Sequence, residues 1–238
     1  MRTTDLDQRG LTEIPAGVLA DHGLEHLNLY HNELTELPEE LWELHGLRVL
    51  NLADNRLRHI SPSIRRLSKV HTLDLGHNEL SALPEEIGEL PALSEYLYVS
   101  GNRLTELPDS LCRLKNLRYL GATDNQLTRL PERLGGLKSL RELRLYHNRL
   151  TALPESIGEL DSLRELHLRG NRLSELPETI AGLRELRMLD LRENQLTELP
   201  EALRTLPKLQ KLDLRWNKRL RLPEWLGTLE ENDCYVLV

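Results

Sequence analysis

The 238-residue chain contains no phenylalanine, and aromatic residues make up only 4% of it. Its hydrophobic fraction of 39% must therefore come from aliphatic residues, which points to a leucine-filled interior. No run of 18 or more apolar residues occurs, so we expect no membrane span, and residues 1–6 lack the apolar stretch of a signal peptide. The only two cysteines, Cys112 and Cys234, lie far apart, which argues against a disulfide framework and favours a cytoplasmic protein.

Basic residues are outnumbered by acidic ones. The chain has 31 Lys and Arg residues against 38 Asp and Glu residues, a formal net charge of −7. Because phosphate backbones bind to basic faces, this balance argues against nucleic acid as the main partner.

A repeat dominates what is present. Asparagine recurs at intervals of 23 residues, with a single interval of 24. The recurring residues are Asn32, Asn55, Asn78, Asn102, Asn125, Asn148, Asn171, Asn194 and Asn217. Apolar residues lie eight, five and three positions before the asparagines, as Leu140, Leu143 and Leu145 do before Asn148. The one exception is Ser94, eight positions before Asn102 in the 24-residue interval, and the whole unit reads LxxLxLxxNxLxxLPxxLxxLxx.

Elementary physics assigns a structure to this unit. Alternation in the LxLx stretch predicts a short strand with leucines pointing inward. The asparagine side chain can bond backbone groups of the neighbouring coil, and the proline begins a short helical turn with acids near its start. Because one unit cannot bury its own leucines, the units must stack into a solenoid.

The repeat resembles that of the leucine-rich-repeat family, in its 23-residue Leu-Pro form, over essentially the whole chain. It is most similar to the cytosolic class associated with Ras-type GTPase pathways, to scaffold proteins of cell polarity and to bacterial relatives. The resemblance implies an α/β-class solenoid, curved and right-handed, with a parallel β-sheet on the concave face and short helical or 3-10 turns on the convex face.

We expect one solenoid domain over residues 1–238. It comprises a degenerate N-terminal cap at 1–23, nine repeats of 23 or 24 residues at 24–230, and a capping strand at 231–238. We expect a monomer, although the outer edge of the last strand would also permit edge-to-edge dimerisation.

The outward-facing strand positions lie six, four and two residues before each asparagine and form columns across the sheet. Five of the six tyrosines fall on these positions: Tyr30, Tyr96, Tyr98, Tyr119 and Tyr146. Tyrosine anchors many protein interfaces, so this enrichment indicates a binding surface. The alternative is that tyrosine simply suits a strand surface.

The C-terminal third of the same face is charged. It carries Arg144, Arg169, Arg192 and Arg215 beside Asp190 and Asp213, with Trp216 at the rim. Such a ladder can neutralise itself, or it can steer an acidic partner into register.

One constellation has the residue types of a metal site. His31, Asp54 and His77 occupy the rim position before the asparagine in three successive coils, and zinc accepts such ligands. However, ligands two coils apart are about 9 to 10 Å apart at the backbone, so we expect no metal and no cofactor. Since no Ser-His-Asp pattern, phosphate loop or HExxH motif occurs, we also expect no enzymatic activity.

These observations predict a module that binds a partner protein on its concave face, in signalling or scaffolding. The family resemblance makes a small GTPase or another signalling protein a candidate partner. The alternatives are a host-directed bacterial effector, delivered into a host cell and acting by binding, and a metal-dependent enzyme at the rim.

Overall fold

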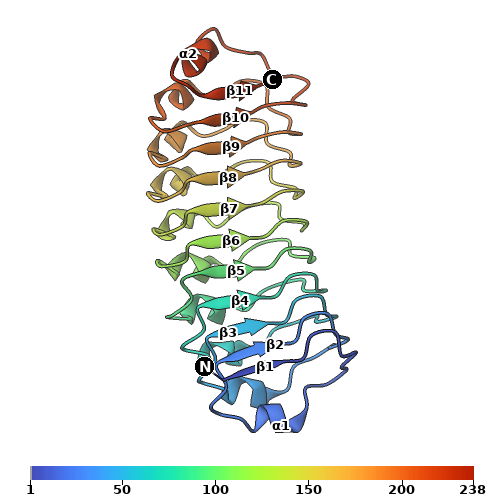
Figure 1. The fold of residues 1–238 in the computed structure, drawn as a ribbon. Helices are drawn as coiled ribbons and strands as arrows, with labels where there is room; N and C mark the ends of the chain where they lie inside the picture. Colours follow the sequence, from blue (N-terminus) through green and yellow to red (C-terminus); the bar gives the residue numbers. More distant parts are fainter. Residues whose placement is uncertain (1) are drawn as a thin grey trace.

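The computed structural model describes residues 2–238 and stacks eleven short strands into one parallel sheet, with the two chain ends at opposite ends of the stack (Figure 1). Strand order follows chain order from β1 to β11. The strands are β1 Thr3–Asp5, β2 His26–Asn28, β3 Val49–Asn51, β4 Thr72–Asp74, β5 Tyr96–Tyr98, β6 Tyr119–Gly121, β7 Glu142–Arg144, β8 Glu165–His167, β9 Met188–Asp190, β10 Lys211–Asp213 and β11 Tyr235–Leu237. The predicted leucine-rich-repeat solenoid with a parallel sheet is confirmed.

Short turns return the chain along the opposite face between successive strands (Figure 1). The 3-10 helices are η1 Glu39–Glu43, η2 Pro62–Arg66, η3 Glu85–Glu89, η4 Asp109–Arg113, η5 Leu134–Gly136, η6 Glu155–Glu159, η7 Glu178–Gly182 and η8 Glu201–Thr205. Two α-helices lie near the ends, α1 at Ala16–Leu19 and α2 at Leu226–Glu231. None of the helices within residues 2–238 has the length and apolarity needed to cross a membrane.

Leucine fills the space between the sheet and the turns. The middle residue of a strand such as β7, Leu143, is fully buried, and so are Leu140 and Leu145 on either side of it. Each repeat therefore contributes its leucines to a continuous core that runs the length of the solenoid.

The repeating asparagines are buried and bonded to backbone. Asn148 donates from Nδ2 to the carbonyls of Ala122, Leu145 and Tyr146 at 2.9 to 3.2 Å, and its Oδ1 accepts the N–H of Leu127 at 3.0 Å. Two of these partners belong to the preceding repeat, so the side chain fastens one coil to the next, as the sequence predicts.

Proline precedes most of the turns. Pro154 lies in extended conformation immediately before η6, with an acidic residue in the first turn, as in most of the other repeats. In the second repeat the proline comes one residue later, at Pro62, and Ser61 takes the capping position by accepting the N–H of Ser63 at 3.2 Å. A serine cap thus compensates for the displaced proline.

The single 24-residue interval is absorbed before β5. The N–H groups of Glu95 and Tyr96 both donate to the backbone carbonyl of His71. In the next coil, the N–H groups of Arg118 and Tyr119 donate to two different carbonyls, those of Ser94 and Glu95. Strand register is unchanged, with Thr72 opposite Tyr96. The extra residue therefore forms a local bulge and does not shift the columns of the sheet.

Additional elements close the two ends of the solenoid. β1 within residues 1–23 pairs in parallel with β2, and β11 pairs in parallel with β10. Of the expected capping segment 231–238, β11 occupies Tyr235–Leu237, and α2 ends at Glu231. Cys112 and Cys234 are both buried and unpaired.

Candidate binding face

The residue before each repeating asparagine has a left-handed backbone. In all nine repeats its φ angle lies between 50° and 69°. These rim residues are His31, Asp54, His77, Gly101, Asp124, His147, Gly170, Glu193 and Trp216. A positive φ costs most side chains energy, so the large Trp216 is held in a conformation that disfavours it. Trp216 is 54% exposed at the rim of the concave face.

A ladder of short polar side chains runs along the column four residues before each asparagine, but only at the two ends of the sheet. There the side-chain oxygen accepts the N–H group two residues further on. The participating residues are Asn28, Asn51, Asp74, Asp190 and Asp213, and Asp5 of β1 makes the same bond in the same column. In β5 to β8 the column instead carries Tyr98, Gly121, Arg144 and His167. In these four strands the local bond between side chain and backbone is therefore absent, and residues of other types occupy the column.

Three of the predicted tyrosines pack against one another on β5 and β6, in a group that we call the tyrosine cluster: Tyr96, Tyr98 and Tyr119. Tyr96 and Tyr98 stack at 5.7 Å between ring centroids, and Tyr98 and Tyr119 lie 4.8 Å apart. A Cβ added at Gly121 would lie 3.0 Å from a Tyr119 ring carbon, so glycine makes room for this ring. Tyr96 remains 42% exposed.

Partial burial also changes the acidity of the cluster. It raises the pKa of Tyr119 to about 12, and burial likewise raises the pKa of Tyr98. Both phenols are therefore neutral hydrogen-bond donors over the physiological pH range.

Arg144 joins the cluster to the charged half of the face. Its guanidinium carbon lies 5.6 Å from the centroid of Tyr119, and its side chain bonds Glu142. Beside them a depression of about 280 Å³ opens. Its lining consists of Glu95, Tyr96, Arg118, Tyr119, Arg141 and Glu142.

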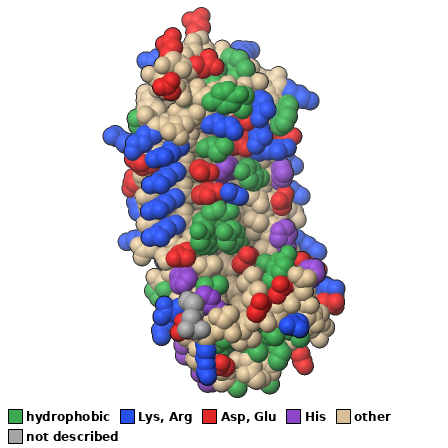
Figure 2. Space-filling view, viewed as in Figure 1, with side chains coloured by type: hydrophobic (Ala, Val, Ile, Leu, Met, Phe, Trp, Pro, Cys, Tyr) green, Lys and Arg blue, Asp and Glu red, His purple; other side chains and the backbone are tan. Residues whose placement is uncertain are grey.

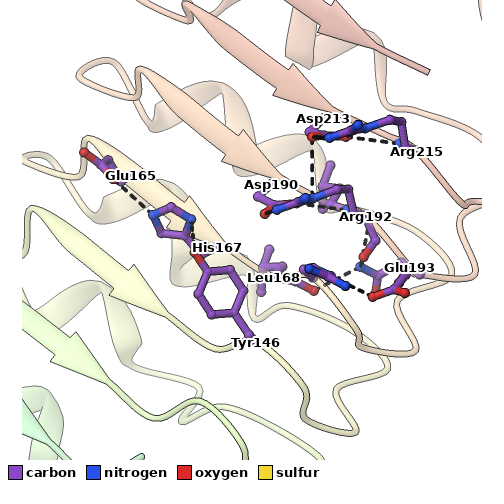
Figure 3. A network of polar contacts seen from close by, with 12 residues as sticks. Tyr146, Glu165, His167, Leu168, Asp190, Arg192, Glu193, Asp213 and Arg215 are labelled. Atoms are coloured by element: carbon purple, nitrogen blue, oxygen red, sulfur yellow. Dashed lines mark hydrogen bonds and ion pairs between the residues drawn. The ribbon is translucent and has the colours of Figure 1, made fainter.

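A second network surrounds His167 on β8 (Figure 3). The hydroxyl of Tyr146 lies 2.7 Å from Nδ1 of the ring, and Nε2 lies 3.1 Å from Glu165 and 3.8 Å from Glu142. Within residues 2–238, Glu142, Glu165 and His167 form the one group of three metal-ligating side chains (His, Cys, Asp or Glu) whose ligand atoms all lie within 4.8 Å of one another. These are the residues that could hold a metal ion. Arg144 already neutralises Glu142, however, which weakens the attraction for a cation.

The C-terminal charges pair within the chain (Figure 3). Arg192 bonds Asp190 through two nitrogens at 2.9 and 2.6 Å, and Arg215 bonds Asp213 at 2.9 and 2.7 Å. Burial alone would raise the pKa of Asp213, but the hydrogen bonds from Arg215 lower it below its usual value. Of the two outcomes left open by the sequence, self-neutralisation describes these pairs.

Arg169 and Trp216 lie beside these Arg–Asp pairs. Arg169 bonds Glu193 at 2.7 Å, and the guanidinium carbons of Arg169 and Arg215 each lie 5.5 Å from the ring of Trp216. The exposed indole is therefore held by two cations at the rim.

Other predicted residues lie outside these networks. Tyr30 on the N-terminal part of the face has His31 as its aromatic neighbour, at 5.8 Å, and is no part of the tyrosine cluster. At the rim, His31 lies 2.5 Å from Asp54, but His77 has no carboxylate within ion-pair distance in the described chain. Within the described chain the ligand atoms of these three side chains do not all lie within 4.8 Å of one another, as those of Glu142, Glu165 and His167 do.

Sequence reasoning missed two features. Tyr235 lies opposite Lys211 in the column six residues before the asparagines, so the sixth tyrosine also lies on a face position. No asparagine follows β11, and counting back from asparagine could not find it. The buried His167 and its glutamates are on predicted face positions, but only side-chain packing shows that they converge.

Two profiles of leucine-rich repeats together match most of the chain. A profile described as leucine-rich repeat region matches residues 67–168, and one described as leucine rich repeat matches residues 2–57 and 161–218. The chain belongs to the leucine-rich-repeat family. No relative was found among curated proteins.

Solved structures of this family resemble the chain closely. A leucine-rich-repeat protein of Leptospira interrogans is 34% identical, with a TM-score of 0.78 over 100% of this chain and 66% of that one. The plant peptide hormone receptor RGFR1, solved in complex with RGF2, is 34% identical, with a TM-score of 0.81 over 90% of this chain and 36% of that one.

The ectodomain of the Arabidopsis thaliana receptor kinase GASSHO1/SCHENGEN3, solved in complex with CASPARIAN STRIP INTEGRITY FACTOR 2, is 32% identical. Its TM-score is 0.82, over 94% of this chain and 28% of that one. The chain thus spans just under two thirds of the Leptospira protein and about a third of each plant receptor.

Proposed function

We propose that the chain is a binding module that docks a polypeptide partner on the concave face of β5 to β8. The tyrosine cluster carries this proposal. Tyr96, Tyr98 and Tyr119 bring three rings together in the middle of the sheet, on the strands where the polar ladder is interrupted. Packed rings offer a large contact area at a low entropic cost, because their side chains are already ordered before binding.

The comparisons support the coarser statement that the fold serves protein binding. Two of the similar plant receptors were solved with the partners named above, and the family is typical of non-enzymatic binding modules. The interrupted polar ladder favours the central strands over the rest of the face. The strands toward its two ends retain the local side-chain-to-backbone bonds.

The partner and the cellular setting form the finer part of the proposal. We favour a folded signalling or scaffolding protein, with a small GTPase as one candidate, and a cytoplasmic location. The two buried, unpaired thiols of Cys112 and Cys234 favour a reducing compartment. Delivery into a host cell, followed by binding there, is the alternative setting.

An affinity capture with matched variants tests the proposal. The chain carrying Tyr98→Ala and Tyr119→Ala is compared with wild type and with Tyr235→Ala, which removes an exposed tyrosine from the end of the same sheet. Circular dichroism and thermal unfolding establish that all three are folded. We expect partners that wild type and Tyr235→Ala retain and the double variant loses. Equal capture by all three would contradict the proposal.

A further inference from the structure

A second basic feature lies on the border of the sheet where the strands begin. The residues directly before β6, β7, β8 and β9 are Arg118, Arg141, Arg164 and Arg187, which we call the arginine ladder. All four are exposed. Figure 2 shows a column of Lys and Arg side chains along the left border of this face, which in Figure 1 is the side where the strands begin.

No member of the arginine ladder forms an ion pair within the described residues 2–238, since none of its four side chains has a carboxylate oxygen within 4.0 Å. Glu142 and Glu165 directly follow Arg141 and Arg164 in the sequence. However, Glu142 pairs with Arg144, and Glu165 lies 3.1 Å from His167.

Two further acids lie near the ladder. Glu95 lies 3.6 Å from His71, and the pKa of Glu185 is lowered chiefly by Lys208, its ion-pair partner, and less by the charges of the ladder.

The N-terminal half of the same column shows that pairing is possible there. Glu25 lies 3.5 Å from Arg48, and His71 lies 3.6 Å from Glu95, so neighbouring members of the column form two pairs along β2 to β5. From β6 onward this pairing stops, and four arginines lie in successive strands. Like charges on adjacent strands destabilise a sheet, so stability of the fold does not account for the ladder.

The ladder adjoins the proposed binding face. Arg118 and Arg141 line the depression that also contains Tyr96 and Tyr119. A ligand seated on the tyrosine cluster would therefore extend directly onto the guanidinium groups. The ladder is a local feature, because the whole chain carries a net charge of −7.

We propose that the arginine ladder binds an extended, acidic segment of the partner polypeptide, which lies across β6 to β9. This inference rests on the proposed function and names the chemistry of the partner. The four arginines span about 14 Å at a strand spacing of about 4.8 Å, which corresponds to about five extended residues. Guanidinium groups pair with carboxylates in a planar, two-pronged geometry, so arginine suits such a segment better than lysine.

A nucleic-acid strand suits this border less well than a peptide. Glu142 and Glu165 lie between the ladder and the rest of the face, at the start of β7 and β8, and Glu95 occupies the ladder's own column directly before β5. A continuous row of phosphates would meet these carboxylates. A peptide carries its acids on alternate residues and can direct them toward the ladder alone.

The test uses a fluorescein-labelled peptide of about ten residues in which Glu alternates with Ser, and the same peptide with Gln in place of Glu. Fluorescence anisotropy at low ionic strength measures binding to wild type, to Arg141→Gln with Arg164→Gln, and to a control with Arg113→Gln and Arg133→Gln. The control removes the same charge from exposed residues of the convex turns.

We expect the Glu peptide to bind wild type and the convex control equally, and about fivefold more weakly to the ladder variant. Added salt should abolish this difference, and the Gln peptide should bind weakly throughout. Equal affinity of the Glu peptide for wild type and the ladder variant, or no binding to wild type, would overturn the inference. So would stronger, ladder-dependent binding of single-stranded RNA used as the competing probe.

The tyrosine variants keep this test separate from that of the proposed function. A partner that is lost with Tyr98→Ala and Tyr119→Ala but kept by the ladder variant would refute the acidic segment and leave the concave binding site standing. A partner that is kept by the tyrosine variant would refute the binding site itself.

Discussion

Replacing one repeating asparagine tests what holds the coils together. In Asn148→Ala the N–H of Leu127 loses its acceptor, and the carbonyls of Ala122, Leu145 and Tyr146 each lose a donor. Asn148 is only 6% exposed, so water cannot readily replace these bonds. The three carbonyls keep other donors, from Asn125, Asn171 and Asp124, so the N–H of Leu127 is the group left without a partner. Such a group costs about 1 to 3 kcal/mol, and the small cavity adds to it. We therefore expect a loss of about 3 kcal/mol of unfolding free energy.

Urea denaturation followed by circular dichroism measures this loss. Asn116→Ala is the matched control, because it makes the same chemical change at an exposed residue and should alter stability by less than about 0.5 kcal/mol. In a solenoid, each repeat contacts only its neighbours, so the variant should also broaden the transition as the two halves uncouple. A loss below about 1 kcal/mol for Asn148→Ala would refute the reasoning.

Two further predictions concern tyrosine acidity and the convex face. Because burial raises the pKa of Tyr119 to about 12, its contribution to stability is complete below the unfolded value of about 10 and disappears as pH rises through about 12. Tyr119→Phe should therefore flatten the fall of unfolding free energy over that interval, and an unchanged slope would count against the burial argument. On the convex face, a Cβ at Gly158 would lie 2.0 Å from the carbonyl oxygen of Thr179, so Gly158→Ala should cost about 1 to 3 kcal/mol in thermal unfolding. Gly227→Ala, which meets nothing within 4 Å in α2, should instead be neutral or stabilising; equal effects would contradict this account.

Most of the fold could be predicted from the sequence because the repeat fixes several levels at once. One periodic pattern sets the strand, the buried asparagine, the turn and the stacking, and all of them agree. The ends were less predictable. Near Tyr235 and in residues 1–23 no asparagine marks the phase, so the positions of β1 and β11 relative to the columns had to come from the structure.

The candidate site was predictable in position but not in its contacts. Counting back from each asparagine places Tyr98 and Tyr119 on the face, because parallel strands in register preserve the columns. Counting does not tell which side chains pair. Arg192 bonds Asp190, whereas Arg164 remains free of carboxylates, and this difference depends on side-chain direction, which the repeat pattern does not encode.

Photo-crosslinking from the tyrosine cluster would test the central claim most directly. Tyr96, which is 42% exposed, is replaced by the photoreactive p-benzoylphenylalanine, and the same replacement is made at Tyr235 and at Arg133 on the convex face. The account predicts that the captured partner crosslinks from position 96 and not from position 133, with little product from position 235. Crosslinks that form from position 133 and not from position 96 would contradict it.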